Sequence, residues 1–313
     1  MLTVLFHGPL NSKELSSVKK SISKIREFKS ASNIEVIIVT WSTYKTISIE
    51  GVDKTLYVDD VNSFTPSGYK PCNVHRIIEL ARIGVFNASN ELIVRLRSDL
   101  EIFDFNQLIR ICSNRVNKGY FFDRKVIAID YSSIDPMRFE IQLPYHVCDW
   151  LHIGFKSDLL KIFDVPIPPI HFFSRYIDEK RNKELGDYIE AMRSETYLTS
   201  FVIRKTFWSN MATENSVSVF QSISSNIRIV KDFEIYNIGK LGIKSVKHPT
   251  NNFDPNRLTE FGYRLWDFQS NNTYPKFFRR LLLKRYYNLR FAYQLFFSVK
   301  KIIKSVIRHT NKS

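Results

Sequence analysis

The sequence predicts an α/β protein with a Rossmann-type mixed sheet flanked by helices, followed by a basic amphipathic C-terminal helical segment. Residues 2–7 (LTVLFH) and 34–40 (IEVIIVT) are almost continuously apolar, as parallel strands buried on both faces are. Between them, residues 13–28 place apolar side chains at helical spacing, which completes a strand–helix–strand unit. With 313 residues, 44% of them hydrophobic, the chain can build the core that such a sheet needs.

The rest of the chain continues this alternation of strands and helices. From apolar periodicity and turn residues we expect strands at 55–60, 91–104, 125–131, 138–143 and 227–237, helices at 73–83, 107–116 and 183–207, and a loop at 245–260. Three widely spaced cysteines form neither a disulfide framework nor a zinc signature, which indicates a reducing compartment. We expect no signal peptide, and no apolar run reaches the roughly 18 residues that would span a membrane.

The net charge of +15 is concentrated at the C-terminus. Residues 268–313 contain eleven basic residues and no acidic one, so the first 267 residues carry a net charge of only +4. From Pro275 onward these cations alternate with aromatic and aliphatic residues, a composition typical of a helix that lies on a membrane surface. The alternative is a C-terminal helix docked on the core with a basic outer face.

Polar residues follow the first two predicted strands at the point where each ends. In open α/β sheets, ligands bind outside the carboxyl ends of the strands. The candidates are His7, Gly8 and Pro9, then Thr40 and Trp41. Gly8 permits a close backbone approach, whereas the Trp41 ring could stack on a base or simply pack.

Two further candidates, Asn73 and Arg76, lie in the first turn of the helix predicted at 73–83. Backbone N–H groups and the helix dipole favour an anion at that position. An ordinary helix cap with a solvent-facing arginine would have the same sequence.

The stretch Glu91 to Asp104 (ELIVRLRSDLEIFD) carries the densest charge pattern. Because residues two apart in a strand point to the same side, Arg95, Arg97, Asp99 and Glu101 would share one face. Two cations and two carboxylates at a strand end suit a phosphate and a divalent metal ion held together. The alternative is an edge strand with a surface ion ladder.

Two other places offer carboxylates for acid–base chemistry. In the stretch Val147 to Leu159, a turn would present Asp149, with Trp150 beside it as a platform for a sugar ring. Glu195 lies in the helix predicted at 183–207, where a solvated carboxylate is the ordinary interpretation. An Asp beside a Trp is also a common composition of surface turns.

Taken together, these segments resemble a known family. The segments FHGPLNS, IVTW, NVHRIIELARIGV, VRLRSDLEI, DWLHIGF and Glu195-Thr196-Tyr197-Leu198 occur in the order and spacing of the WavE-type lipopolysaccharide biosynthesis proteins, which have a GT-A-like glycosyltransferase fold. The resemblance covers roughly residues 1–205. It implies one GT-A-like domain over residues 1–267, with a nucleotide-sugar half at about 1–105 and an acceptor half at about 106–267. The tail at 268–313 is set apart by its charge, and from Pro275 onward it lies outside the resemblance.

The resemblance also implies an activity and its partners. A glycosyltransferase of this family would move a sugar from a nucleotide-diphosphate sugar to a lipid-linked glycan in lipopolysaccharide, O-antigen or capsule synthesis. It would act in the cytoplasm, on the inner face of the bacterial cytoplasmic membrane, held to the anionic membrane surface by the C-terminal tail. No nucleic-acid partner is expected, because the positive charge lies in the tail and is not spread over a folded face.

Residue roles follow from the same resemblance. Asp99 takes the place of the carboxylate that binds metal or diphosphate, and Glu101 is its possible second ligand for Mg²⁺ or Mn²⁺. Arg95 and Arg97 would contact phosphate or hold the carboxylates. If transfer inverts the configuration of the sugar, a base is also needed, and Asp149 is the first candidate and Glu195 the second.

The chain departs from the family's pattern at one point. It has Asp-Leu-Glu where many GT-A enzymes have Asp-x-Asp, so metal dependence is left open. The rival interpretation is a non-catalytic membrane-surface or partner-binding protein with a degenerate α/β scaffold.

Overall fold

The computed structural model describes residues 1–28, 31–61, 73–114, 117–130, 133, 147–167, 198–199 and 229–247. Its strands are β1 (Leu2–His7), β2 (Ile34–Trp41), β3 (Lys54–Val58), β4 (Leu92–Arg97), β5 (Leu100–Ile102), β6 (Val126–Ile129), β7 (Leu151–Phe155), β8 (Phe233–Tyr236) and β9 (Ile243–Ser245). Its helices are α1 (Ser12–Arg26), α2 (Val74–Asn87), α3 (Phe105–Ser113) and α4 (Lys156–Phe163), with the short 3₁₀ turns η1 (Ala31–Asn33), η2 (Ser42–Tyr44) and η3 (Ile238–Leu241). The strand expected at 138–143 and the tail at 268–313 lie outside the described residues, as does the helix expected at 183–207 apart from residues 198–199.

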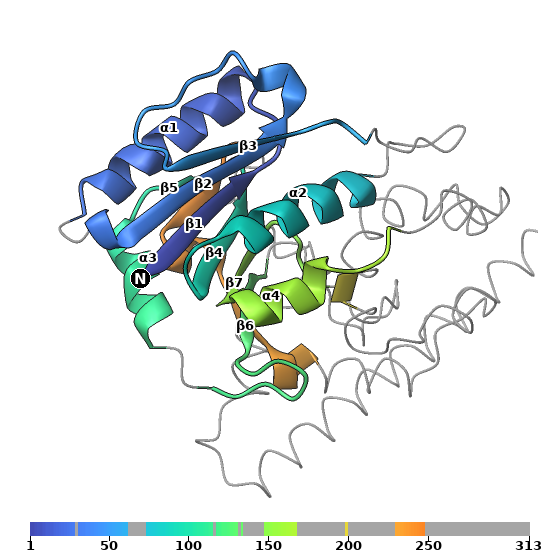
Figure 1. The fold of residues 1–313 in the computed structure, drawn as a ribbon. Helices are drawn as coiled ribbons and strands as arrows, with labels where there is room; N and C mark the ends of the chain where they lie inside the picture. The colour runs from blue at the N-terminus through green and yellow to red at the C-terminus, as the bar shows by residue number, and fades with distance from the viewer. Residues whose placement is uncertain are drawn as a thin grey trace, which may run out of the picture.

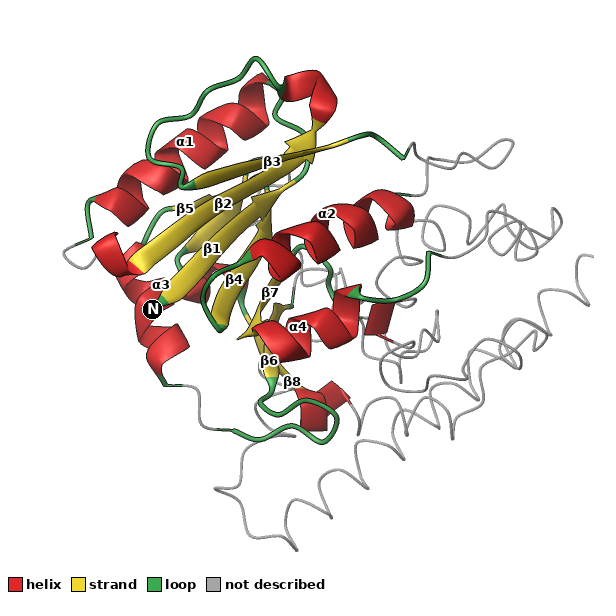
Figure 2. Cartoon of the chain, in the orientation of Figure 1, coloured by secondary structure: helices red, strands yellow, loops and turns green. Residues whose placement is uncertain are grey.

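Seven of the strands form one mixed sheet in the order β3-β2-β1-β4-β7-β6-β8 (Figures 1 and 2). Strand β7 runs antiparallel to both of its neighbours, β4 and β6, whereas the other pairs in the sheet are parallel. The residues that precede β7 therefore lie at the same edge as the residues that follow β1, β2, β4 and β6. The predicted fold class, a mixed α/β sheet flanked by helices, is confirmed.

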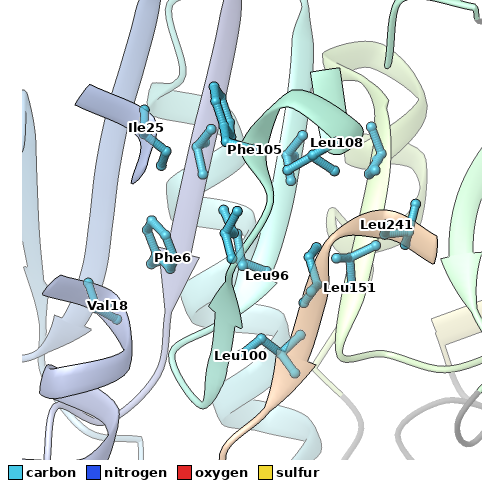
Figure 3. Close-up of a cluster of buried hydrophobic side chains, with 14 of the residues drawn as sticks. Phe6, Val18, Ile25, Leu96, Leu100, Phe105, Leu108, Leu151 and Leu241 are labelled. Atoms are coloured by element: carbon cyan, nitrogen blue, oxygen red, sulfur yellow. The ribbon is translucent and has the colours of Figure 1, made fainter. Parts of the chain in front are cut away.

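Helices cover both faces of this sheet, and the alternation of side chains along each strand explains why. In β1, Leu5 packs on the face that α2 and α4 cover, while Val4 and Phe6 pack on the face of α1 and α3. Figure 3 shows the second of these cores, in which Phe6 of β1, Val18 of α1 and Leu108 of α3 all lie on one face of the sheet. Full burial of each such aliphatic or aromatic side chain stabilises the fold by roughly 1.5–3 kcal/mol.

The stretch Glu91 to Asp104 differs from its prediction as one continuous strand. Strand β4 ends at Arg97, a turn follows at Ser98 and Asp99, and the chain resumes as β5, which pairs with β9 in a separate two-stranded sheet. The turn is held because the Ser98 backbone N–H donates to the His7 carbonyl (2.9 Å) and its hydroxyl donates to the Pro9 carbonyl (2.7 Å). The prediction that four charged side chains share the face of one strand is therefore wrong.

A second difference concerns the stretch Val147 to Leu159. The bend at Asp149 and Trp150 is present, but β7 and α4 follow it directly, and neither was predicted. Strand β7 is only five residues long, and its apolar run is interrupted by a buried histidine, His152. No helix among the described residues has the length and apolarity needed to cross a lipid bilayer.

Candidate active site

The ends of β1 and β2 and the turn after β4 are bonded together at the carboxyl edge of the sheet. The Gly8 backbone N–H donates to the Val39 carbonyl (3.1 Å), and the Thr40 hydroxyl donates to the Gly8 carbonyl (2.8 Å). Gly8 has φ +127°, and a Cβ atom there would lie 2.8 Å from the Ser98 hydroxyl oxygen. Because only glycine tolerates both conditions, the close contact between these strand ends depends on Gly8.

Arg95 is the largest fully buried side chain of the site. Its Nη1 donates to the Asp149 carbonyl and lies 3.2 Å from His152 Nδ1, and its guanidinium lies 4.6 Å from the centre of the Phe163 ring. Burial lowers the pKa of Arg95 to about 9, with Arg97 adding to the effect and Asp149 opposing it. Arg95 therefore remains a cation at neutral pH.

Two histidines accompany Arg95 on the same face of the sheet. His152 of β7 lies directly opposite Arg95 of β4, and His7 of β1 lies directly opposite Arg97 of β4. Burial, followed by the charge of Arg95, lowers the pKa of both histidines well below the ordinary value, so both are neutral at pH 7.

Several buried polar atoms of this cluster have no hydrogen-bond partner among the described residues. They are Nε2 of His7, Nε and Nη2 of Arg95, and Oδ1 of Asp149. Buried polar atoms are nearly always hydrogen-bonded in native proteins, to the protein, to water or to a ligand. The cluster thus offers both hydrogen-bond donors and acceptors to a bound group at the edge of the sheet.

Asp99 is held by Arg97 through two parallel hydrogen bonds. Arg97 Nε lies 3.0 Å from Oδ1 and Nη2 lies 2.5 Å from Oδ2. The Arg97 guanidinium also covers the ring of Trp150, 4.8 Å from its centre. Burial alone would lower the pKa of Arg97, but Asp99 and Asp149 outweigh it and raise the pKa above the ordinary value.

Glu101 does not share this environment. It lies in β5 directly opposite Lys244 of β9, whose Nζ is 2.7 Å from Oε1, and the Nζ of Lys20 is 3.9 Å from Oε2. Within the described ranges, no group of three or more His, Cys, Asp or Glu side chains could hold a metal ion. With the Asp99 carboxylate bonded to Arg97 and that of Glu101 to Lys244, the arrangement does not fit a divalent cation shared by the two.

The predicted residues at the start of α2 form a separate polar group. Arg76 donates from Nε to Asp60 Oδ1 (2.7 Å), from Nη2 to the second oxygen, and from Nη1 to Asn73 Oδ1 (3.4 Å). Trp41 is buried in the core, and the Arg76 guanidinium lies 5.6 Å from the centre of its ring. Glu195 lies outside the described residues.

The structure adds residues that sequence reasoning missed. Asp130 follows β6 at the same edge as the other strand ends, and its side chain accepts from Asn237 Nδ2 (3.3 Å). The strand-end argument used for His7 and Thr40 could have identified it, because the apolar run VIAI directly precedes it. Lys247 lies 3.8 Å from Asp99 Oδ2 and follows β9, in a region predicted as a loop, so no pattern pointed to it.

Comparisons with solved structures give similarities at low sequence identity. The chain is similar to galactosyltransferase LgtC in complex with donor and acceptor sugar analogues (11% identity, 89% of this chain, 99% of that chain, TM-score 0.38). It is similar to mouse xyloside xylosyltransferase 1 (9% identity, 77% of this chain, 95% of that chain, TM-score 0.36). It is also similar to glycosyltransferase GlyE of Streptococcus pneumoniae TIGR4 (12% identity, 66% of this chain, TM-score 0.33), of which it spans 44%.

A search of curated proteins found no significant match. The family comparison is different, because a family described as WavE lipopolysaccharide synthesis matches residues 2–305. That range contains every described strand and helix and every candidate site residue. The chain therefore belongs to the WavE lipopolysaccharide synthesis family.

Proposed function

We propose that this chain is a glycosyltransferase that moves a sugar from a nucleotide-diphosphate donor to a lipid-linked glycan during lipopolysaccharide, O-antigen or capsule synthesis. Membership of a lipopolysaccharide synthesis family supports the biological setting. The solved proteins to which the chain is similar include several glycosyltransferases, which agrees with the proposal.

One observation carries the proposal. Polar side chains from three separate segments, namely β1, β4 and the bend just before β7, come together near the carboxyl edge of the sheet. His7, Arg95 and Asp149 are all buried there and keep polar atoms without a partner in the described part of the chain. A purely structural cluster would be expected to satisfy those atoms internally, because each unpaired buried group costs about 1–3 kcal/mol.

The donor would bind along this edge. His7, Gly8, Pro9 and Thr40 would line it from β1 and β2, and Asn73 and Arg76 from the start of α2. As the bond between the sugar and the diphosphate breaks, negative charge grows on the departing phosphate oxygen. Fixed cations at that position stabilise the transition state, and Arg97 is the cation best placed to do so.

Asp149 is the proposed base. The acceptor hydroxyl would give its proton to the Asp149 carboxylate while its oxygen forms the new bond to the anomeric carbon and the diphosphate leaves with the old bonding pair. The Asp149 Oδ1 atom has no hydrogen-bond partner among the described residues, so it is available to a hydroxyl. Glu195 remains the second candidate for the base. Trp150 would contact the acceptor sugar through the edge of its ring, because the Arg97 guanidinium covers one face.

Replacing Asp149 by asparagine tests this assignment. The side chain keeps its shape but loses its basicity, so Asp149→Asn should lower the rate of transfer at least a hundredfold, the low end of what a general base contributes. Binding of the nucleotide-diphosphate sugar, measured by calorimetry, should change less than threefold. The assay would follow transfer from radiolabelled UDP-, GDP- or TDP-sugars to lipid-linked glycan.

Asp164→Asn is the matched control, since Asp164 is an exposed carboxylate at the end of α4. It should leave transfer unchanged. Unaltered transfer in Asp149→Asn would move the base elsewhere, with Glu195 next in line. A wild-type protein whose melting temperature responds to no nucleotide diphosphate or nucleotide sugar would instead favour the non-catalytic alternative.

A further inference from the structure

The charges around Asp99 are arranged in two layers. The carboxylates lie inside: the side chains of Asp99 and Glu14 are 2% and 4% exposed. The cations that bind them lie outside: the side chains of Arg97 and Lys247 are 27% and 40% exposed. A ligand that arrives from solvent therefore meets Arg97 and Lys247 before it meets either carboxylate.

Lys247 is held beside Asp99 by its own ion pairs and by a backbone hydrogen bond of the preceding residue. Its Nζ lies 2.7 Å from Glu14 Oε1 of α1 and 3.8 Å from Asp99 Oδ2. The backbone is tied as well, because the N–H of Val246 donates to the carbonyl of Asp99 (3.0 Å). The turn after β4 and the end of β9 thus form one unit, with a lysine on its outer side.

Arg97 is fixed from three directions. Asp99 holds its Nε and Nη2, the Trp150 ring lies under its guanidinium, and its own backbone N–H donates to the Trp150 carbonyl (3.0 Å). A side chain that is already ordered loses less entropy when it binds a ligand. A planar guanidinium also suits the oxygens of a phosphate, and a lysine ammonium can add a second positive charge.

The same arrangement would repel a divalent cation, because the outer charges are positive. To reach Asp99 it would have to displace Arg97 from a two-point contact and approach Lys247, and both are positively charged. Glu101, the expected second ligand, belongs to a different sheet and lies beneath Lys244 and Lys20, whose side chains are 47% and 65% exposed. The layered charges thus favour an incoming anion over an incoming metal ion.

We infer that Arg97 and Lys247 form a cationic clamp for the diphosphate of the donor, and that this clamp binds the diphosphate without a divalent cation. Asp99 is a positioning residue, which holds both cations toward the incoming phosphates and is not a metal ligand. The inference rests on the proposed function, since it takes a nucleoside diphosphate as the ligand.

Calorimetry on the full chain tests the clamp, with UDP, GDP, CDP and TDP as probes, once in excess EDTA and once in Mn²⁺. We expect at least one nucleoside diphosphate to bind with a Kd that agrees within about threefold between the two conditions. Lys247→Met should weaken that binding about tenfold, and Lys247→Arg should restore it, because the charge returns. Each lost charge should also make the Kd less sensitive to salt.

Two further variants, a control at Lys244 and a substitution of Asp99, are measured in the same way. Lys244→Met removes a lysine three residues earlier, inside β9 and bonded to Glu101, and should leave the Kd unchanged. Asp99→Asn should weaken binding in EDTA and in Mn²⁺ by the same factor. A metal ligand would instead lose only the part of the affinity that depends on Mn²⁺. Lys247→Met leaves the Glu14 carboxylate buried without its partner. The double variant Glu14→Gln/Lys247→Met removes both charges, and its Kd is therefore measured alongside that of the single variant.

The outcomes separate this inference from the proposed function. Binding that appears only with Mn²⁺, or that is the same in Lys247→Met and in the wild type, would overturn the clamp and leave the glycosyltransferase proposal standing. If no nucleoside diphosphate and no nucleotide sugar binds under either condition, the proposed function fails and the clamp fails with it.

Discussion

Asp130, at the carboxyl end of β6, is a carboxylate kept in a place that disfavours its charge. It is buried, its carboxylate accepts from the side-chain amide of Asn237 (3.3 Å), and its backbone N–H donates to the Tyr236 carbonyl (3.0 Å). Burial raises the pKa of Asp130 to about 6. Residues with such shifts gather at functional sites more often than elsewhere, and Asp130 lies at the edge where the site forms.

This shift gives a pH dependence of known sign. Between pH 3.8 and about 6 the folded state keeps a proton that the unfolded state has released, so stability falls as pH rises through that window. Asp130→Asn removes the effect, and above pH 6 it should raise the free energy of unfolding by up to about 3 kcal/mol, since one pKa unit corresponds to 1.36 kcal/mol. Near pH 4 the two proteins should be almost equally stable.

Urea denaturation of wild type and Asp130→Asn at pH 4 and pH 8 measures the difference. Asp164→Asn serves again as an exposed carboxylate that should show no such gain. A variant that gains the same stability at both pH values, or none at pH 8, would show that ionisation of Asp130 is not the cause.

Some residues of the candidate site could be predicted from the sequence and others could not. His7, Gly8 and Thr40 could be proposed because they lie at the ends of almost continuously apolar strands, and the structure places them together at one edge. His152 was not proposed because it interrupts the short apolar run of β7, and Lys247 was not proposed because its position depends on pairing between β5 and β9. Contacts that join residues about 150 positions apart leave no local pattern.

Among the elements, the amino-terminal ends of β1, β2 and β3 are joined by one carboxylate, Glu35. It accepts from the Thr3 hydroxyl (2.6 Å) and from both the N–H and the hydroxyl of Ser89 (2.8 Å each), and it lies 2.8 Å from Lys54 Nζ. Burial would raise its pKa, but the four contacts with Lys54, Thr3 and Ser89 outweigh burial and lower the pKa of Glu35 to about 2. This edge lies opposite the candidate active site.

The Glu35 network should stabilise the fold at neutral pH. A carboxyl group with a lowered pKa contributes stability that is present above its ordinary pKa of 4.5 and is lost as pH falls toward 2. Because solvent around the half-exposed Lys54 screens part of the interaction, we expect Glu35→Gln to cost about 1–2 kcal/mol at pH 7. The deficit should shrink steadily between pH 4.5 and pH 2.5 in chemical denaturation experiments.

Glu91→Gln, at an exposed carboxylate just before β4, is the matched control and should change stability little at any pH. A deficit in Glu35→Gln that stays constant as the pH falls would assign the effect to packing and not to charge.

Strands and helices were predictable where the apolar pattern was long. Strands β1 and β2 and helix α1 match their predictions closely because the strands are apolar at nearly every position and the helix places its apolar residues at regular helical spacing. The split of β4 from β5 was not predictable, since LIVRLRSDLEI alternates through the turn without a glycine or proline to mark it. The turn is imposed by bonds to His7 and Pro9, which only the folded sheet brings near.

For the whole molecule, the main prediction is that the positively charged C-terminal tail binds a membrane surface. Residues 268–313 hold the eleven cations of the C-terminus and lie outside the described residues, so their membrane binding stays a prediction. Each Lys or Arg near an anionic surface contributes about 1 kcal/mol, and five or six of them would hold the protein to a membrane. The domain division at residue 267 is likewise a prediction.

Truncation before Pro275 should release the protein from vesicles that contain anionic lipid. We expect the full chain to float with vesicles of 30% phosphatidylglycerol in a sucrose gradient and to remain at the bottom with pure phosphatidylcholine. The truncated chain should remain at the bottom with both. Equal flotation of the two chains would place the membrane contact in residues 1–274.

The reversed direction of β7 separates the two halves of the proposed reaction along the chain. The proposed donor side is built by residues that leave strands, whereas Asp149, the proposed base, belongs to a segment that enters one. Changes of length or composition in the connection between β6 and β7 can therefore alter the approach to Asp149 without moving β1 or β4. A family built on this sheet could diversify its acceptors while its donor-binding strands keep their register.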